Sequence, residues 1–355
     1  MAVFKHLYTR KNAGQKPLPH IHFKHDNYPG NPVLPFFLNE DYHGRSKIWE
    51  QFEKVDFDPI DAVQAILKSY GLEHKNITRC TQGSLPVYNI DNRWILKLYF
   101  PILFEDHQIE TRCLDILKGI KRIPVPEIIG AGTIDHWPFL IQSHLQGNHL
   151  HPDYEKLDLE KLTGIICDLA EIIRILHQLE FVELNSPLMR FDWQQYAKYQ
   201  FNHCLKNQQS KGLSLAWLKA LENFITENAG LILQEKVKPV LLHTELMDTC
   251  IFYQEQDGSF QLSGICDWAE AFFGPAEYEL PSIVLFVTRT QSSLLKLFFK
   301  KYAYFPDALD ETLQIKLMLN LLIHRYCNIP WFMELYPPVF KEPCFYRLAR
   351  QWFAF

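Results

Sequence analysis

Lys97 is the first residue whose position could support chemistry. It stands in the middle of the apolar segment Trp94–Tyr99, where burying an unpaired ammonium group would be costly. Glu110 lies on the helix predicted next and could pair with it, and Glu105 is the alternative partner. Lys97 could instead lie at a strand edge and extend its ammonium group into water. The residues around Lys97 favour a role in binding a ligand.

Two acidic residues far along the chain could complete a reactive set. Glu245 follows a short apolar strand in a predicted loop, and Asp267 ends another apolar strand directly after Ile265 and Cys266. A carboxylate in such a position needs a strong partner, although a helix cap or a turn is an alternative role for Asp267. One cation and two separate carboxylates are what phosphoryl transfer requires. The cation holds the nucleotide phosphates, one carboxylate orients the acceptor hydroxyl, and the other holds Mg²⁺.

The elements that must position Lys97 and Glu110 are mainly strands. Residues 86–90 and 94–99 flank the turn at 91–93 and predict a hairpin, and residues 127–134 and 138–145 predict a second strand pair. A helix is expected between these pairs, at 105–117. A further amphipathic helix at 61–70 has Ala62, Val63, Ile66 and Leu67 on its apolar face and Gly71 at its end.

The elements around Glu245 and Asp267 are mainly helices. Apolar residues recur at helical spacing from Leu162 to Leu176, and more helices are expected at 192–207, 214–228, 291–302 and 311–326. A β island interrupts them, with strands at 240–242, 251–253 and 260–266 and a hairpin turn at Asp257-Gly258. The order predicts an α+β chain with a small β-rich lobe, a connector and a larger helical lobe.

Taken together, the segments resemble the aminoglycoside phosphotransferase family. Residues 243–252 and 264–271 look like its two signature segments, and residues 95–99 resemble its nucleotide-lysine strand. Supporting segments occur in the family's order at 123–127, 138–147 and 169–177, and residues 325–331 are similar to the hygromycin-kinase-like branch. The resemblance implies a protein-kinase-like bilobal fold. The expected parts are an N-terminal extension (1–55), a nucleotide-binding N-lobe (56–146) and a helical C-lobe with the catalytic loop and acceptor site (147–355).

The resemblance also implies roles for individual residues. Lys97 would contact the phosphates of ATP or GTP, and Glu110 would orient it. Backbone groups near Gln142 and His144 would hold the base, and the turn with Ser84 would lie over the phosphates. Asp267 would bind Mg²⁺. Glu245 would lie close to the hydroxyl of a small-molecule acceptor, which in this family includes aminoglycoside antibiotics, choline-like alcohols and sugars.

The chain departs from the family pattern at two positions. Glu245 stands where the family has its catalytic Asp, and the extra methylene moves the carboxylate by roughly a bond length, a shift that can lower the rate severely. Cys250 stands where the family has a metal-binding Asn, and a thiol is a poor ligand for Mg²⁺. Either a single metal relies on Asp267 and water, which we favour, or Asp248 supplies an oxygen.

Other residues near these motifs have more than one interpretation. His243 could be a ligand, but we expect it to brace the loop through hydrogen bonds. Glu270, Glu277 and Glu279 could meet an amine-bearing acceptor. The aromatic residues Trp331, Phe332, Tyr336, Phe345, Tyr346, Trp352 and Phe353 are more typical of core packing than of a ligand cage, although they lie in the expected acceptor lobe.

Composition narrows the class of protein. The 355 residues are 47% hydrophobic and 22% charged, with a net charge of −5, which fits a globular protein and argues against nucleic acid as a partner. No apolar stretch approaches the length of a membrane span. The eight cysteines form no CxxC pair and are expected to be reduced thiols, typical of a cytoplasmic protein.

The sequence therefore predicts a nucleotide-dependent kinase of small molecules. The alternative is a catalytically impaired pseudokinase or nucleotide-binding module, which Glu245 and Cys250 would explain. A protein kinase is disfavoured, because no activation segment is recognisable between Asp267 and the helices that follow. The acceptor, the choice between ATP and GTP, the number of metals and the oligomeric state are left open.

Overall fold

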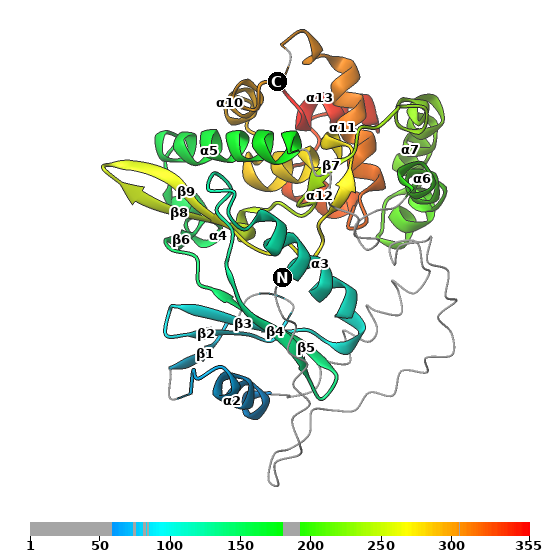
Figure 1. Ribbon diagram of the computed structural model, residues 1–355. Coiled ribbons are helices and arrows are strands. Elements are labelled where there is room, and N and C mark those ends of the chain that lie inside the picture. Colours follow the sequence, from blue (N-terminus) through cyan, green and yellow to red (C-terminus); the bar gives the residue numbers. More distant parts are fainter. Residues whose placement is uncertain (1–58, 74–75, 81–82, 84, 180–191, 305) are drawn as a thin grey trace, which may run out of the picture. The chain divides into compact units, whose positions relative to one another are not determined.

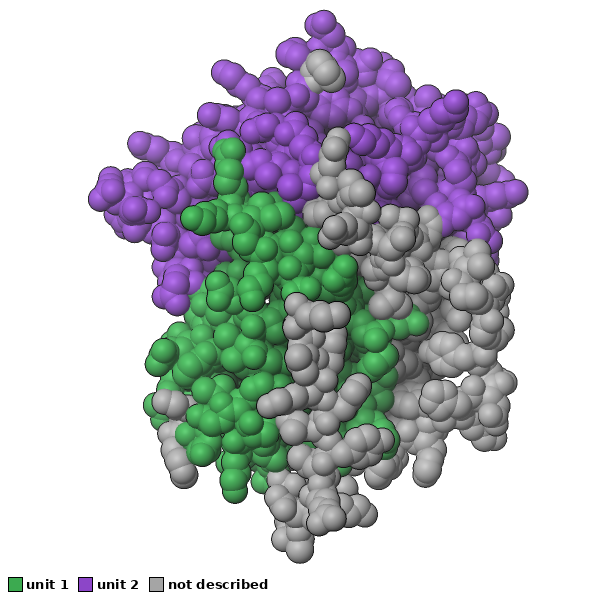
Figure 2. Space-filling view, in the orientation of Figure 1, with its two compact units in different colours: residues 1–33, 39–145, 266–270 green, residues 34–38, 146–265, 271–355 purple. Residues whose placement is uncertain are grey.

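The computed structural model describes residues 59–355, except 74–75, 81–82, 84, 180–191 and 305. The expected N-terminal extension and Ser84 lie outside the described residues. The chain forms two compact units (Figure 2). Within the described part, unit 1 comprises residues up to Leu145 together with Cys266–Glu270, and unit 2 comprises Gln146–Ile265 and Ala271–Phe355.

Unit 1 is built on a five-stranded antiparallel sheet (Figure 1). Its strands, in spatial order, are β1 (Ile77–Arg79), β2 (Val87–Ile90), β3 (Trp94–Leu98), β5 (Trp137–Ser143) and β4 (Ile128–Ile134). The predicted hairpins are present, and Asp91 and Asn92 adopt positive φ between β2 and β3, which matches the twist of a tight hairpin.

Two α-helices accompany this sheet, α2 (Ile60–Ser69) and α3 (Phe104–Leu117). The four apolar residues predicted for one face of α2 are all buried in the core that Leu96, Trp137 and Phe139 of the sheet help to form. The helix α3 follows β3 after a short 3₁₀ turn, Pro101–Leu103, so that Lys97 and Glu110 belong to consecutive elements.

Unit 2 is mainly helical, as expected (Figure 1). Its longest helix is α5 (Leu159–Gln178), where the side chain of Asp158 accepts a hydrogen bond from the Lys161 amide and so caps the N-terminus. The other helices of eight or more residues are α6 (Trp193–Ser210), α7 (Leu215–Asn228), α10 (Ser292–Tyr302), α11 (Glu311–Ile323) and α13 (Phe345–Trp352). Shorter ones are α4 (Leu150–Asp153), α8 (Gly230–Leu233), α9 (Leu280–Ser282) and α12 (Ile329–Leu335).

The β island of unit 2 consists of two small antiparallel sheets. One contains β6 (Asn148–His149), β8 (Ile251–Gln256) and β9 (Ser259–Ile265), and the other pairs β7 (Val240–Leu242) with β10 (Phe272–Gly274). A Cβ at Gly164 of α5 would lie 2.1 Å from the Phe260 carbonyl oxygen. Glycine is therefore needed where this helix packs against β9.

The sequence prediction differs from the structure mainly at the C-terminus. The helix expected at 311–326 ends at Ile323, and α12 and α13 were not predicted. The start of α12 carries an ordinary signal, because the Asn328 side chain accepts a hydrogen bond from the Trp331 amide and Pro330 occupies the first turn. Both helices lie in a segment rich in aromatic residues, where the regular spacing of polar residues that indicates a helix is difficult to recognise.

Two further expectations can be compared with the structure. All eight cysteines are free thiols, and four of them, Cys113, Cys204, Cys250 and Cys327, are buried. None of the helices in the described ranges combines the length and the hydropathy that crossing a bilayer requires.

Candidate active site

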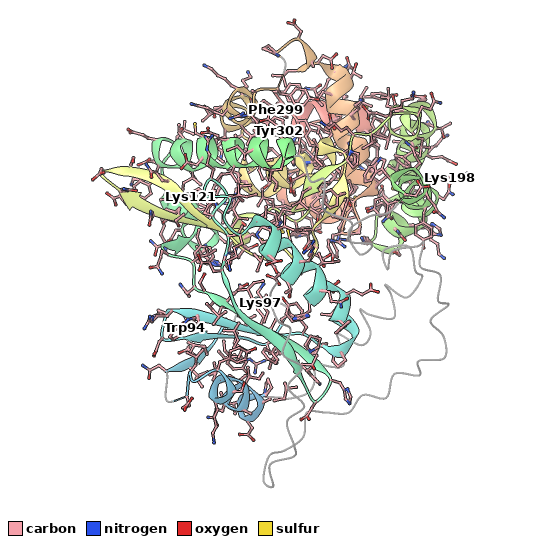
Figure 3. The ribbon with its side chains drawn as sticks, viewed as in Figure 1. Trp94, Lys97, Lys121, Lys198, Phe299 and Tyr302 are labelled. Carbon is pink, nitrogen blue, oxygen red and sulfur yellow. The ribbon has the colours of Figure 1, made fainter. Side chains whose placement is uncertain are left out.

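Lys97 is buried in unit 1 between two carboxylates. On β3 it lies opposite Val87 of β2 and Leu140 of β5, and its side chain is visible beside the sheet in Figure 3. Its Nζ lies 2.7 Å from Glu110 Oε1 and 3.2 Å from Asp267 Oδ1. The structure thus pairs the lysine with Glu110 rather than Glu105, and it brings Asp267 from a distant part of the sequence to the same ammonium group.

The charges of this cluster support one another. Burial alone would lower the pKa of the Lys97 ammonium group, but Asp267 and Glu110 outweigh burial and hold that pKa well above its ordinary value. The Tyr99 hydroxyl donates to the second oxygen of Glu110, and burial together with the negative charge of Glu110 raises the pKa of Tyr99 well above its usual range. Lys97 therefore stays charged, and Glu110 is held by both Lys97 and Tyr99.

Asp267 is the accessible member of this cluster. Its side chain is 57% exposed, whereas those of Lys97 and Glu110 are 9% and 1% exposed. Its φ of 68° is in the left-handed region, which Asp tolerates better than most residues. Burial raises the pKa of the preceding Cys266 thiol to about 12, so that thiol remains protonated and adds no charge.

The chemistry of Asp267 fits Mg²⁺. Its carboxylate offers the hard oxygen ligand that Mg²⁺ prefers, and Mg²⁺ in nucleotide sites is commonly held by one or two carboxylates together with phosphates and water. The described residues contain no cluster of three or more His, Cys, Asp or Glu side chains that could hold a metal ion.

The residues expected to hold the nucleotide base lie at the end of β5. Gln142 is buried within the sheet, opposite Ile95 of β3 and Ile128 of β4. The Ser143 amide donates to the Glu127 carbonyl at 2.8 Å, and the His144 amide donates to the Arg93 carbonyl at 2.9 Å. A base recognised here by backbone groups must use groups other than these two amides.

In unit 2, the loop that follows β7 presents Glu245. Thr244, directly before it, has a φ of 73°, which is costly for a β-branched residue and is held only when the surroundings enforce it. The surroundings are Glu279 and His177. The amides of His243 and Thr244 donate to Glu279 Oε1 at 2.6 and 3.0 Å.

Glu279 supports this loop, a role that the sequence did not reveal. It is fully buried, and its other oxygen lies 2.7 Å from His177 Nε2. Burial would raise the pKa of the Glu279 carboxyl, but the His177 hydrogen bond and the nearby His243 and Thr244 hold it below its ordinary value. The suggestion that Glu279 meets an amine-bearing acceptor is therefore not supported by its position: it braces the loop, as we had expected of His243.

The same loop is also held by residues just after α11. The pKa of His324 is lowered to about 4, by burial and by the charge of Arg325, so its ring is neutral near pH 7. The ring accordingly donates from Nε2 to the Thr244 carbonyl at 3.2 Å and accepts at Nδ1 from the Tyr326 amide at 3.4 Å. Arg325 donates to the Thr244 hydroxyl at 3.4 Å. Thr244 is thus contacted at its amide, its carbonyl and its side chain.

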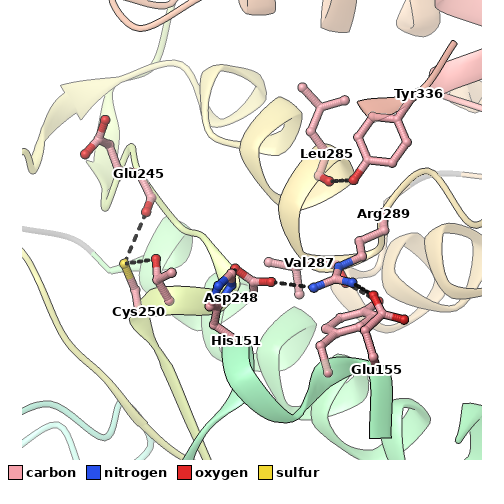
Figure 4. Close-up of polar contacts among 11 residues, drawn as sticks. His151, Glu155, Glu245, Asp248, Cys250, Leu285, Val287, Arg289 and Tyr336 are labelled. Carbon is pink, nitrogen blue, oxygen red and sulfur yellow. Dashed lines mark hydrogen bonds and ion pairs between the residues drawn. The ribbon is translucent and has the colours of Figure 1, made fainter. Parts of the chain in front are cut away.

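Cys250 turns back toward the loop. Its thiol donates to the Glu245 carbonyl at 3.5 Å and lies 3.9 Å from the Thr249 hydroxyl (Figure 4). The thiol therefore stabilises the backbone at Glu245.

Asp248 is paired with Arg289 and is also contacted by His151. Arg289 donates to its Oδ2 at 2.9 Å, and His151 Nδ1 lies 3.1 Å from its Oδ1 (Figure 4). Arg289 also pairs with Glu155 and stacks on Tyr154, with its guanidinium carbon 3.6 Å from the ring centroid. Burial would lower the pKa of Arg289, but Asp248 outweighs burial and raises it. These contacts favour a role for Asp248 in positioning the side chains around it over a role as a ligand of Mg²⁺.

Comparisons with known proteins show what the chain is similar to. The model of the phosphotransferase enzyme family matches residues 77–312, which is more than half of the chain. No curated protein sequence matches the chain.

Three solved structures of aminoglycoside phosphotransferases share the fold. The GDP and kanamycin complex of APH(2″)-IIIa is 14% identical with a TM-score of 0.62, and the match covers 78% of this chain and 96% of that one. The streptomycin–ATP complex of APH(2″)-IIa is 14% identical with a TM-score of 0.55, covering 79% and 96%. A thermostable APH(4)-Ia with AMP-PNP and hygromycin B is 13% identical with a TM-score of 0.56, covering 81% and 96%.

These similarities confirm the predicted fold class, an α+β, protein-kinase-like bilobal fold. The match of the family model extends over the Lys97 cluster, the Glu245 loop and Asp267. The chain therefore belongs to the phosphotransferase enzyme family.

Proposed function

We propose that this protein is a small-molecule kinase, which transfers the terminal phosphoryl group of ATP or GTP to a hydroxyl group. The observation that carries the proposal is the position of Lys97, shared by Glu110 and Asp267. Buried charges cost stability, and apolar residues of similar volume commonly fold as well or better. A charge cluster with one exposed carboxylate is therefore better explained by ligand binding than by folding.

In unit 1, Lys97 would bind the nucleotide phosphates. Glu110, which Tyr99 holds in turn, fixes its ammonium group, and this limits the freedom that the lysine loses when a nucleotide binds. Asp267 would hold Mg²⁺, which when bound supplies positive charge to the transferring group. Gln142 and His144 remain the proposed neighbours of the base, and Ser84 that of the phosphates.

In unit 2, Glu245 would act on the acceptor. Its carboxylate would orient the hydroxyl and take up its proton. The acceptor oxygen then forms a bond to the terminal phosphorus, the bond from that phosphorus to the bridging oxygen breaks, and the nucleoside diphosphate leaves with the bonding electrons. Thr244 and Cys250 position Glu245 and need not touch the reacting atoms.

The acceptor is the least defined part of the proposal. The solved relatives hold kanamycin, streptomycin or hygromycin B, so aminoglycosides belong in any screen, and activity on them would make this an antibiotic-resistance enzyme. Choline-like alcohols and sugars are the other candidates.

A second candidate function is nucleotide binding without transfer. The observation that favours it is Cys250, whose soft sulfur donates to the Glu245 backbone in place of a hard metal ligand. A thermal-shift titration with Mg²⁺ and ATP or GTP separates the candidates in part. A shift without transfer to any acceptor favours this second function, and no shift under any condition would exclude both.

Two substitutions test the kinase directly, in a screen for phosphoryl transfer to aminoglycosides and hydroxylated metabolites. We expect Asp267→Asn to lower the transfer rate about a thousandfold or more, and Glu245→Gln to lower it about a hundredfold or more, with little change in nucleotide affinity for the latter. The exposed Asp307→Asn and Glu160→Gln are matched controls that should retain the wild-type rate. Full activity of Glu245→Gln would show that this residue is not the base.

A further inference from the structure

A cavity of about 110 Å³ lies beside Glu245 and is lined by residues of unit 2 alone. Its other lining residues are mainly apolar and include Met247, Leu285, Phe286, Trp331 and Phe332. The residue proposed to receive the acceptor therefore borders an apolar space. This is the place where an acceptor's body must lie if its hydroxyl reaches Glu245.

Three aromatic side chains form one wall of this cavity. Phe286 lies 5.8 Å from Trp331 and 5.9 Å from Phe332 between ring centroids, and Trp331 lies 5.3 Å from Phe332. Phe332 is buried, whereas Trp331 remains 40% exposed. Rings that pack against one another in this way hold their orientation, and the exposed indole leaves apolar surface for a ligand to cover.

The backbone is widened at the same wall. Leu285 and Phe286 belong to a π-helical turn, Ile283–Val287, in which the Thr288 amide donates to the Ile283 carbonyl at 2.8 Å. The Tyr336 hydroxyl donates to the Leu285 carbonyl within this turn (Figure 4). Single π turns occur often at functional sites, because they displace side chains from the regular helical positions. The turn is thus independent support for a ligand site here.

The cavity has little negative charge. Among the described residues that line it, Glu245 is the one carboxylate, and His324 is neutral because its pKa is about 4. Ser282 also lines it, but its hydroxyl donates to the Glu279 carbonyl at 2.7 Å. Asp248, the buried acid nearest in sequence, is already paired with Arg289. Several ammonium groups of one acceptor would not find partners in this lining, and leaving them unpaired would be costly.

The size of the cavity limits what it can take. A dry, apolar protein cavity of about 150 Å³ accommodates benzene, so one of about 110 Å³ suits a single ring or a short branched alkyl group. We propose that this cavity binds a ring-sized apolar group of a hydroxyl-bearing acceptor, with the hydroxyl at Glu245, and that the acceptor is not a polycationic sugar. The predicted reaction at this cavity rests on the proposed function, whereas the predicted binding does not.

The experiment compares 2-phenylethanol with ethanol, which lacks the ring, and with kanamycin. Binding to the full-length protein is measured by ligand-observed NMR without nucleotide, and transfer is measured with Mg²⁺ and ATP or GTP. We expect 2-phenylethanol to bind about tenfold or more tightly than ethanol, because the ring leaves water. We expect its kcat/KM to exceed that of ethanol by a similar factor and also to exceed that of kanamycin.

Trp331→Ala should weaken the binding of 2-phenylethanol about tenfold. Its matched control is Trp217→Ala, which removes an indole that packs on Phe340 and Phe345 outside the cavity and should leave binding unchanged. If Trp331→Ala does not fold, Phe286→Trp, which narrows the cavity, should weaken binding in the same direction.

Two results would overturn the inference: equal binding of 2-phenylethanol to the wild type and a folded cavity variant, or a higher kcat/KM for kanamycin. Ring-dependent binding without transfer to any acceptor would support the cavity assignment while refuting the proposed kinase. The two proposals therefore fail in different ways.

Discussion

The Lys97 cluster and the Glu245 loop are held by different forces. In unit 1, Lys97 is fixed by opposite charges, with Glu110 buried beside it and Asp267 exposed. In unit 2, Glu245 is carried by a loop whose backbone is held mainly at Thr244, where the amide donates to Glu279 and the carbonyl accepts from His324. The first arrangement places charge where a charged ligand would bind. The second fixes one carboxylate beside an apolar cavity.

The difference shows that the two ligands of a kinase are recognised in different ways. A triphosphate is recognised by charge, so the binding residues must stay ionised although they are buried. An acceptor hydroxyl needs one carboxylate in an accurate position, and a displacement of about 1 Å can cost about a hundredfold in rate. Changes to the loop supports should therefore affect folding and positioning, whereas changes to the Lys97 cluster should affect nucleotide binding.

Removing the main support of the loop should have the largest effect. Glu279→Ala leaves His177 and the His243 and Thr244 amides without their buried partner, and we expect the free energy of unfolding to fall by about 3–5 kcal/mol. Urea unfolding measures this change. Glu277→Ala is the matched control, because Glu277 accepts a 3.2 Å hydrogen bond from Tyr304 and does not hold the loop. Equal losses in the two variants would contradict the bracing role.

Acid should destabilise both units through one histidine each. The pKa of His107 in unit 1 is lowered to about 4 by burial, as is that of His324 in unit 2 by burial and by Arg325. Because these folded-state values lie below the ordinary 6.5, the unfolded chain takes up protons first as the pH falls. The contribution of each histidine to the free energy of unfolding is fully present above about pH 6.5. It is lost progressively as the pH falls to about 4, by about 3 kcal/mol for each histidine.

Glutamine can separate the two histidines. In His107→Gln the amide can still donate to the Phe139 carbonyl, and in His324→Gln it can still donate to the Thr244 carbonyl. Between pH 6.5 and 4, the free energy of unfolding should fall less in each variant than in the wild type. Unfolding experiments at a series of pH values measure this difference. A pH profile unchanged in both variants would show that other groups control the acid sensitivity.

In the Lys97 cluster, Glu110→Gln should act on nucleotide binding. The substitution removes a charge at 2.7 Å from the ammonium group, and we expect kcat/KM for the nucleotide to fall about 10- to 100-fold while the fold persists, because Asp267 still pairs with Lys97. Glu105 lies on the same helix, but Lys97 pairs with Glu110 and Asp267 instead, so Glu105→Gln should leave kcat/KM unchanged. An equal effect of both variants would contradict a specific role for Glu110.

The sequence predicted the charged part of the site better than the apolar part, for a physical reason. A lysine in an apolar strand and an aspartate at the end of another stand out, because each needs a partner, and their order along the chain matches the family. The strands and most of the helices followed from turns and apolar periodicity. Glu279 was considered only as a partner for an amine-bearing acceptor, because its supporting role depends on two backbone amides and on His177, over a hundred residues earlier.

The aromatic wall was equally hard to foresee. Phe286 and Trp331 come from separate elements, and nothing in their spacing distinguishes a ligand-facing ring from the core rings Phe345 and Trp352. The π turn that widens the backbone at Phe286 also has no sequence signature. Residues that act through packing are therefore defined only by the structure.

Cys250→Asn should have the smallest effect. It changes both a support of the Glu245 loop and the ligands that a metal could use. The thiol donates one weak hydrogen bond to the Glu245 carbonyl, which the Asn amide can replace, so we expect the free energy of unfolding to change by less than about 1 kcal/mol. Asn also offers an oxygen to a metal, so the transfer rate should stay the same or rise severalfold, most clearly at low Mg²⁺.

Rates measured across a Mg²⁺ titration test this expectation, with Cys327→Ser as a control for a buried thiol elsewhere. A fall of tenfold or more in Cys250→Asn would mean that the thiol positions Glu245 in a way that the amide cannot reproduce.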